Sequence, residues 1–356
     1  MALALVLLLG IGLIVFPLAD GLPKKTQGVD NVQDTFRDAM SKEGLKTSRE
    51  DLVTMQLMLE QLQDETLPAL GARINMNPQQ TEQFLGARFN KVGAGLAQVD
   101  EIMPRFDHLV LVMEQQGQNF READEIPTSH LPNTAVTYLF LIPGVILTVV
   151  GAAGLFFSFR RPGRSVVPTV ALGVAVAMGA IIVAGTLVTD QIGKTQSAEK
   201  MFDAFRESFT EQGYERARTD LDVLEGMATQ MQTEVIPFLA ATAQQTPEQY
   251  TAGLASQYQD LGKGLAQLPR ILGRFDGMVE DIGHNIESFK DADSIPTADT
   301  PVSQVPWYLM IPGIGLIVIA GAALLPLGRK DGGAPSVSPT ADTPAGASPV
   351  GSSPRA

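Results

Sequence analysis

Four long apolar runs divide the chain. They cover residues 1–19, 135–159, 166–188 and 304–328, and none of them contains Asp, Glu, Lys, Arg or His. A helix needs about 20 apolar residues to cross ~30 Å of hydrocarbon at ~1.5 Å per residue. The pattern therefore predicts four transmembrane helices. They enclose two long polar stretches, which we name the first segment (20–134) and the second segment (189–303).

The first apolar run is expected to remain in the mature protein. It begins Met1-Ala2-Leu3 without the basic residues that open a secretory signal, and no small-x-small cleavage pattern precedes Asp20. We interpret it as an uncleaved transmembrane helix.

The chain matches itself at an offset of 169 residues. Lys25-Thr26-Gln27 returns as Lys194-Thr195-Gln196, and Arg105-Phe106-Asp107 returns as Arg274-Phe275-Asp276. Each unit would hold two spans, so the two units share one orientation and form a parallel internal repeat about an axis along the membrane normal. Fusion of a symmetric homodimer produces this arrangement.

Each segment is predicted to be helical, because no stretch alternates with the period of two that strands require. A first helix carries Val32, Phe36 and Met40 on one stripe. Its expected ends are Gly44 and, in the second segment, Gly213, since glycine suits a helix C-terminus.

A second helix is expected to begin after Ser48, whose hydroxyl together with Asp51 resembles a capping box. Pro68 in the first segment and Pro237 in the second are expected to kink or end it. Proline lacks the amide donor and clashes with the preceding turn.

The third helix has the strongest local pattern. Asn77 and Thr246 are expected N-caps, each followed by proline and then by Gln80 or Gln249. Apolar positions then recur at alternating steps of four and three, which predicts one heptad-patterned helix packed in a left-handed sense. At ~1.5 Å per residue, a helix over 78–125 would extend ~70 Å from the membrane. In the first segment the seam positions are Leu85, Phe89, Val92, Leu96, Val99, Met103, Phe106, Val110, Met113, Gly117 and Phe120.

The predicted fold is an all-α multi-pass membrane protein with two duplicated helical domains outside the cytoplasm. Three arginines lie in the turn at 160–165, and Arg329-Lys330 follow the last span, so both termini are expected in the cytoplasm of a plasma membrane protein. Lys24 and Lys25 oppose this orientation. Residues 329–356, rich in Pro, Ser, Ala and Thr, are expected to be a disordered cytoplasmic tail.

Composition and charge exclude several classes of function. The chain has 39 acidic and 26 basic residues, and both segments are acidic, which argues against binding of nucleic acid. It has no cysteine, and its three histidines, His108, His130 and His284, lack metal-ligand spacing. No nucleotide-binding or hydrolase motif is present. We expect no enzyme activity, no metal and no cofactor.

The third helix ends in the same motif in both segments, just before the next span. One interpretation is a membrane-entry elbow, in which proline stops the helix; the other is a partner-recognition or cation site that adds Glu122 and Asp291. The candidate residues are Asp124, Ile126, Pro127, Asp293, Ile295 and Pro296.

These features favour a non-enzymatic membrane scaffold, or an accessory subunit of a cell-envelope complex, that binds a membrane or envelope protein outside the cytoplasm. Homo-oligomer formation and lipid binding stay open. An alternative is a ligand sensor, since two spans around a helical outer domain are similar in layout to bacterial chemoreceptors, although no signalling coiled coil follows the spans. Another alternative is a helper of lipid or polymer export.

Overall fold

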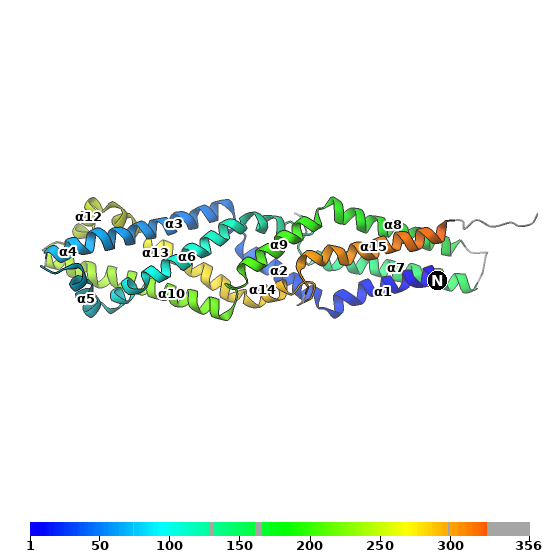
Figure 1. The fold of residues 1–356 in the computed structure, drawn as a ribbon, viewed down its shortest axis with the longest axis horizontal. Helices are drawn as coiled ribbons and strands as arrows, with labels where there is room; N and C mark the ends of the chain where they lie inside the picture. Colours follow the sequence, from blue (N-terminus) through cyan, green and yellow to red (C-terminus); the bar gives the residue numbers. More distant parts are fainter. Residues whose placement is uncertain (74, 129–130, 161–165, 298–299, 326–356) are drawn as a thin grey trace, which may run out of the picture.

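The computed structural model describes residues 1–73, 75–128, 131–160, 166–297 and 300–325. This part of the chain is nearly all helical, with no strand, and forms a long rod (Figure 1). The predicted turn residues 161–165, the predicted tail 329–356 and His130 lie outside the described residues.

Four helices at one end of the rod are long and apolar enough to span a membrane, as the sequence predicted. Helix α1 packs against α7, α8 packs against α15, and α7 joins the two pairs. The N-terminus lies at the outer end of this bundle, and the remaining helices form a stalk at the other end (Figure 1). The helices are α1 (Ala2–Ala19), α7 (Ala135–Arg160), α8 (Val167–Val188) and α15 (Val305–Leu324).

Small residues allow the paired spans to approach closely. A Cβ atom added to Gly10 in α1 would lie 2.6 Å from the backbone nitrogen of Thr148 in α7. One added to Gly179 in α8 would lie 2.5 Å from the carbonyl oxygen of Gly313 in α15. Close backbone contact at glycine is a common way for membrane helices to associate.

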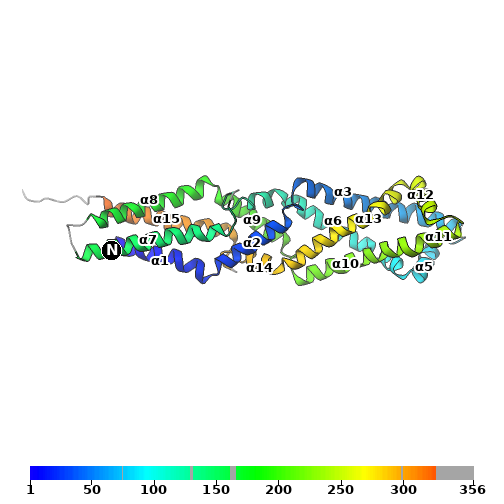
Figure 2. The same cartoon turned by 180° about the vertical axis from the view of Figure 1, so that it is seen from behind.

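The stalk is built by helices of both segments, which interlock. Helix α3 lies beside α13, α6 lies beside α9 and α10, and α2 lies beside α14 (Figures 1 and 2). The first segment supplies α2 (Leu22–Phe36), α3 (Lys42–Gln61), η1 (Leu62–Thr66), α4 (Leu67–Arg73), α5 (Pro78–Arg88) and α6 (Asn90–Ala123). The second supplies α9 (Gln191–Phe205), α10 (Glu211–Gln230), η2 (Met231–Val235), α11 (Ile236–Thr242), α12 (Pro247–Gln257), α13 (Gln259–His284), α14 (Ile286–Asp293) and η3 (Val302–Gln304).

The predicted boundary between the first two stalk helices is wrong. Helix α2 already ends at Phe36, and α3 begins at Lys42 instead of after Ser48. The N-cap is Ser41, whose hydroxyl accepts a hydrogen bond of 3.0 Å from the Gly44 amide. Gly44 therefore lies in the first turn of α3 and does not end a helix.

The second segment repeats this local structure. Thr210 caps α10 by accepting a 3.0 Å hydrogen bond from the amide of Gly213. A Cβ on Gly213 would meet the carbonyl oxygen of Glu207 at 2.4 Å, so the tight turn before the helix requires glycine here. Both glycines are explained by this close approach.

Pro68 does not end the helix, because a π-helical turn precedes it. The amide of Leu67 donates to the carbonyl oxygen of Leu62, five residues back, and α4 then continues through Pro68. The wider π turn accommodates a residue that lacks an amide donor. The same turn, η2, precedes Pro237.

The predicted continuous third helix is wrong, since the chain breaks it at Phe89 and at Tyr258. Phe89 has φ −126° and ψ 80°, outside the helical region. Across this break, a Cβ on Gly93 would lie 2.4 Å from the Cα of Gly86. Helix α5 therefore folds against α6 instead of extending it, and the stalk is shorter than ~70 Å of uninterrupted helix implies.

A glutamine from the opposite segment caps the helix that begins after each break. The side-chain oxygen of Gln230 accepts hydrogen bonds from the amides of Lys91 (2.8 Å) and Val92 (3.1 Å) at the start of α6. Gln61 accepts one from the amide of Leu261 (2.8 Å) at the start of α13. Amides that a continuous helix would satisfy internally are thus paired between segments.

Most of the predicted seam positions after the break are buried in the stalk, whereas Leu96 and Ile286 are only partly buried. The rings of Phe106 and Phe275, which stand 169 residues apart, meet edge to face at 5.2 Å. The buried seam residues are Val92, Val99, Met103, Phe106, Val110, Met113 and Phe120 in α6, and Leu261, Leu265, Leu268, Leu272, Phe275, Val279 and Ile282 in α13.

Candidate functional site

The acidic residues of the predicted elbows are held in ion pairs. Arg37 donates to both carboxylate oxygens of Asp124, at 3.2 and 2.8 Å. Arg206 does the same to Asp293, at 2.9 and 2.8 Å. Each carboxylate raises the pKa of its arginine by accepting these hydrogen bonds. A guanidinium group therefore occupies the position that a bound cation would take.

Ile126 and Ile295 are buried, and each precedes a cis proline, Pro127 or Pro296. Asp124, Ile126 and Pro127 thus lie in one elbow, whereas Asp293, Ile295 and Pro296 lie in the other. The six candidate residues form two separate structural corners.

Each elbow is bound by the opposite segment. The Lys25 ammonium donates to the carbonyl oxygens of Ser294 (3.0 Å) and Pro296 (2.9 Å). Lys194 donates to the carbonyl oxygen of Glu125 at 3.1 Å. Gln191 donates to the carbonyl oxygen of Pro127 at 2.6 Å. These contacts connect the membrane-proximal ends of the two segments and favour the elbow interpretation.

Buried carboxylates join the segments in the middle of the stalk. Arg105 of α6 forms a two-bond pair with Asp220 of α10, and Arg274 of α13 donates from Nε to Asp51 of α3 at 2.6 Å. Asp51 and Asp220 are almost fully buried. Sequence reasoning missed both pairs, since the partners are far apart along the chain.

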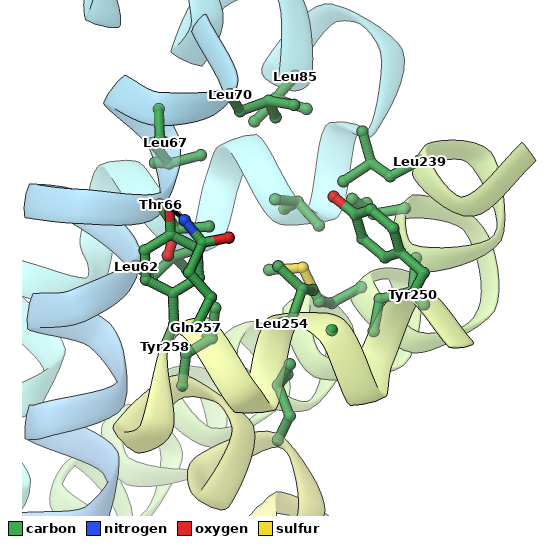
Figure 3. Close-up of a pocket in the computed structure, with 18 of the residues that line it drawn as sticks. Leu62, Thr66, Leu67, Leu70, Leu85, Leu239, Tyr250, Leu254, Gln257 and Tyr258 are labelled. Carbon is green, nitrogen blue, oxygen red and sulfur yellow. Dashed lines mark hydrogen bonds between the residues drawn. The ribbon is translucent and has the colours of Figure 1, made fainter. Parts of the chain in front are cut away.

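A cavity of about 240 Å³ lies at the membrane-distal end of the stalk, between the two segments (Figure 3). Side chains from η1 and α4 form one wall, and α12 forms the opposite wall. The described residues that line it are all uncharged: Leu62, Thr66, Leu67, Ala69, Leu70, Leu85, Val92, Leu96, Met231, Val235, Ile236, Leu239, Gln245, Tyr250, Gly253, Leu254, Gln257, Tyr258, Leu261 and Leu265.

Metal-binding groups are not gathered in the part of the chain that the structure describes. No cluster there of three or more His, Asp or Glu side chains could hold a metal ion. His108 and His284 are exposed at the surface, which agrees with the interpretation of these two as surface residues. The lining of the distal cavity is uncharged and mixes apolar side chains with the polar groups of Thr66, Gln257 and Tyr258.

No family model matches this chain, and no curated protein or solved structure is significantly similar to it.

Proposed function

We propose that this membrane protein is a non-enzymatic scaffold or accessory subunit of a plasma-membrane complex. Its interlocked stalk would bind a membrane or envelope protein outside the cytoplasm. The observation that carries the proposal is the reciprocal pairing of buried Asp51 and Asp220 with arginines of the opposite segment. These pairs make one rigid rod of both segments, and a rigid rod holds a bound partner at a fixed distance from the membrane.

We also infer that the chain is a parallel internal repeat with both termini in the cytoplasm. Reciprocal contacts at an offset of 169 residues support the repeat, as in Gln230 with Val92 and Gln61 with Leu261. The N-terminus lies at the bundle end far from the stalk, and Arg160 ends α7 at that end (Figure 1). Lys25, which opposes this orientation by charge, binds Asp20 and two elbow carbonyls, so its position has a structural reason.

Purification of the tagged full chain from its native membrane in a mild detergent tests the scaffold role. We expect one envelope or membrane protein to remain bound in a fixed ratio by quantitative mass spectrometry. The double variant Arg105→Ala/Arg274→Ala, with the interlock broken, should lose it. The exposed Arg216→Ala, whose nearest carboxylate lies 3.9 Å away, should retain it. A chain recovered alone or only as a homo-oligomer would contradict the proposal.

A second candidate role is an extracytoplasmic ligand sensor that signals through a partner. The uncharged distal cavity favours it, because a recess of this size at the end of a stalk is accessible to small molecules. Helices that connect the cavity wall to the spans would carry the signal. Saturable thermal stabilisation of the full chain by a small molecule would support the role.

A further inference from the structure

We propose that the distal cavity is a binding site for a small uncharged molecule with an apolar body, and that small residues from both segments open it. The inference names the ligand class of the proposed sensor. It is independent of the scaffold role, since its test measures occupancy of the cavity and not capture of a partner.

The first argument is that small residues replace phenylalanine at the cavity. Ala69 lines it in α4, whereas the position 169 residues later is Phe238. Phe238 packs edge to face on Phe89 at 5.8 Å, and the Arg88 guanidinium lies 4.3 Å from its ring centre. At the matching place of the other half, an aromatic cluster thus fills the space that Ala69 leaves open.

The same replacement occurs on the opposite wall. Gly253 of α12 lines the cavity, whereas the matching residue of α5 is Phe84, which packs against the core of the stalk tip. A Cβ added to Gly253 would meet no atom within 4 Å. Both positions that line the cavity thus lack the phenylalanine ring carried by their matching positions.

The second argument is that α12 has no buried residue, whereas its counterpart α5 buries Thr81. Helix α5 approaches α4 closely, with Thr81 fully buried and its hydroxyl 2.4 Å from a Cβ placed on Gly71. The matching residues of α12 and α11 are Tyr250 and Ala240, which are too large for that approach. Helix α12 accordingly buries no residue, and the cavity lies beneath it.

The lining defines the ligand. A closed apolar cavity of ~150 Å³ binds benzene, so the volume of about 240 Å³ is large enough for a substituted ring or a medium-length alkyl chain. Burial of a charged group would need a partner that this lining does not offer. Thr66, Gln257 and Tyr258 lie across the cavity from Tyr250 (Figure 3) and supply hydrogen-bonding groups for one polar end.

The test uses the full chain in lipid nanodiscs with ¹³C-methyl methionine and 1-octanol as the probe. Met231 lines the cavity, whereas Met103 is buried in the same core away from it. We expect octanol to shift the Met231 methyl resonance saturably and to leave Met103 unchanged. Octanoate, with the same chain and a negative charge, should bind at least about tenfold more weakly. No shift at Met231, or equal binding of octanoate, would overturn the inference.

Cavity-filling variants make the test specific. Gly253→Phe and Ala69→Phe restore the residue found at the matching position, so each should weaken the octanol response at Met231 by about tenfold or more. Gly273→Phe is the matched control. It is also an exposed helical glycine with open space around its Cβ, but it lies outside the cavity. An undiminished response in both filled variants, with the remaining methionine spectrum native, would contradict the site.

Discussion

Arg105 donates two hydrogen bonds to Asp220, from Nε to Oδ2 at 2.7 Å and from Nη2 to Oδ1 at 2.9 Å. The arginine belongs to the first segment and the aspartate to the second. The aspartate side chain is only 10% exposed, and the arginine side chain is 42% exposed. The pair therefore holds a buried carboxylate of one segment with a half-exposed guanidinium of the other.

Removal of this arginine should destabilise the stalk. Arg105→Ala leaves the Asp220 carboxylate buried without its cation, a change that costs about 3–5 kcal/mol for a fully buried pair. We expect about 2 kcal/mol here, because water reaches the exposed side of the guanidinium. Chemical unfolding of the purified full chain by circular dichroism measures the loss. Arg216→Ala, at the surface, should change the free energy of unfolding by less than about 0.5 kcal/mol.

Substitution of the glutamine that caps α6 should also destabilise the stalk. Gln230→Met keeps the length of the side chain but leaves the amides of Lys91 and Val92 without their acceptor. A buried unpaired donor costs about 1–3 kcal/mol. Hydrogen exchange should accelerate at these two amides first. Gln232→Met, at an exposed position, serves as the control, and equal exchange in both variants would contradict the capping role.

The sequence predicts the four apolar helices well and the course of the stalk helices poorly. Long uncharged runs have few alternatives to a helix in a membrane. In contrast, the heptad spacing continues without change through Phe89 and Tyr258, where the helices break. The acceptors that stabilise these breaks are Gln61 and Gln230 of the opposite segment, so no local pattern indicates them.

For the candidate sites too, the sequence identifies some features, and others depend on the fold. The elbow residues Asp124 and Asp293 are identifiable from the repeated motif, but their pairing with Arg37 and Arg206 depends on the fold. A signal for the distal cavity is present in the sequence. The replacement of Phe84 by Gly253 stands out once the two halves are aligned, although the alignment alone does not show that the position faces a cavity.

Acid should weaken one contact between the segments. The Ser197 hydroxyl donates a hydrogen bond to the Glu122 carboxylate, and the Gln118 side-chain amide donates a second one. Both bonds lower the pKa of Glu122 from its usual value of 4.5, and the bond from Ser197 has the larger effect. The ionised Glu122 carboxylate therefore stabilises the folded state. This contribution is fully present above pH 4.5 and is lost as pH falls through the lowered pKa of the folded state. Ser197→Ala should therefore lower the free energy of unfolding at pH 7 more than at pH 3. Equal destabilisation at both pH values would contradict the assignment.

The proposed orientation predicts which engineered cysteines are accessible in intact cells. The chain has no native cysteine, so single labels are unambiguous. Glu207→Cys, at a side chain that is 92% exposed, should react with a membrane-impermeant maleimide without lysis. Ser348→Cys, beyond the last span, should react only after lysis. The reverse pattern of labelling would show that the orientation in the membrane is opposite to the proposed one.

The interlocked stalk is tested most directly by a cross-link between α6 and α10. A Cβ on Gly95 would lie 2.7 Å from the Cβ of Met227, which is shorter than the ~3.8 Å of a disulfide, so the two helices must move apart by about 1 Å to form the bond. The double variant Gly95→Cys/Met227→Cys carries a protease site inserted after Gly163, which separates the segments on cleavage. Gly95→Cys/Glu207→Cys, with its second cysteine before the opposite end of α10, is the control.

After mild oxidation in native membranes and proteolysis, a non-reducing denaturing gel gives the answer. Interlocked segments predict that the Gly95→Cys/Met227→Cys chain migrates as one linked species that reductant separates into two fragments. The control should give two fragments under both conditions. Two free fragments from the Gly95→Cys/Met227→Cys chain without reductant would show that the segments fold apart, and would contradict the single stalk on which the proposed function depends.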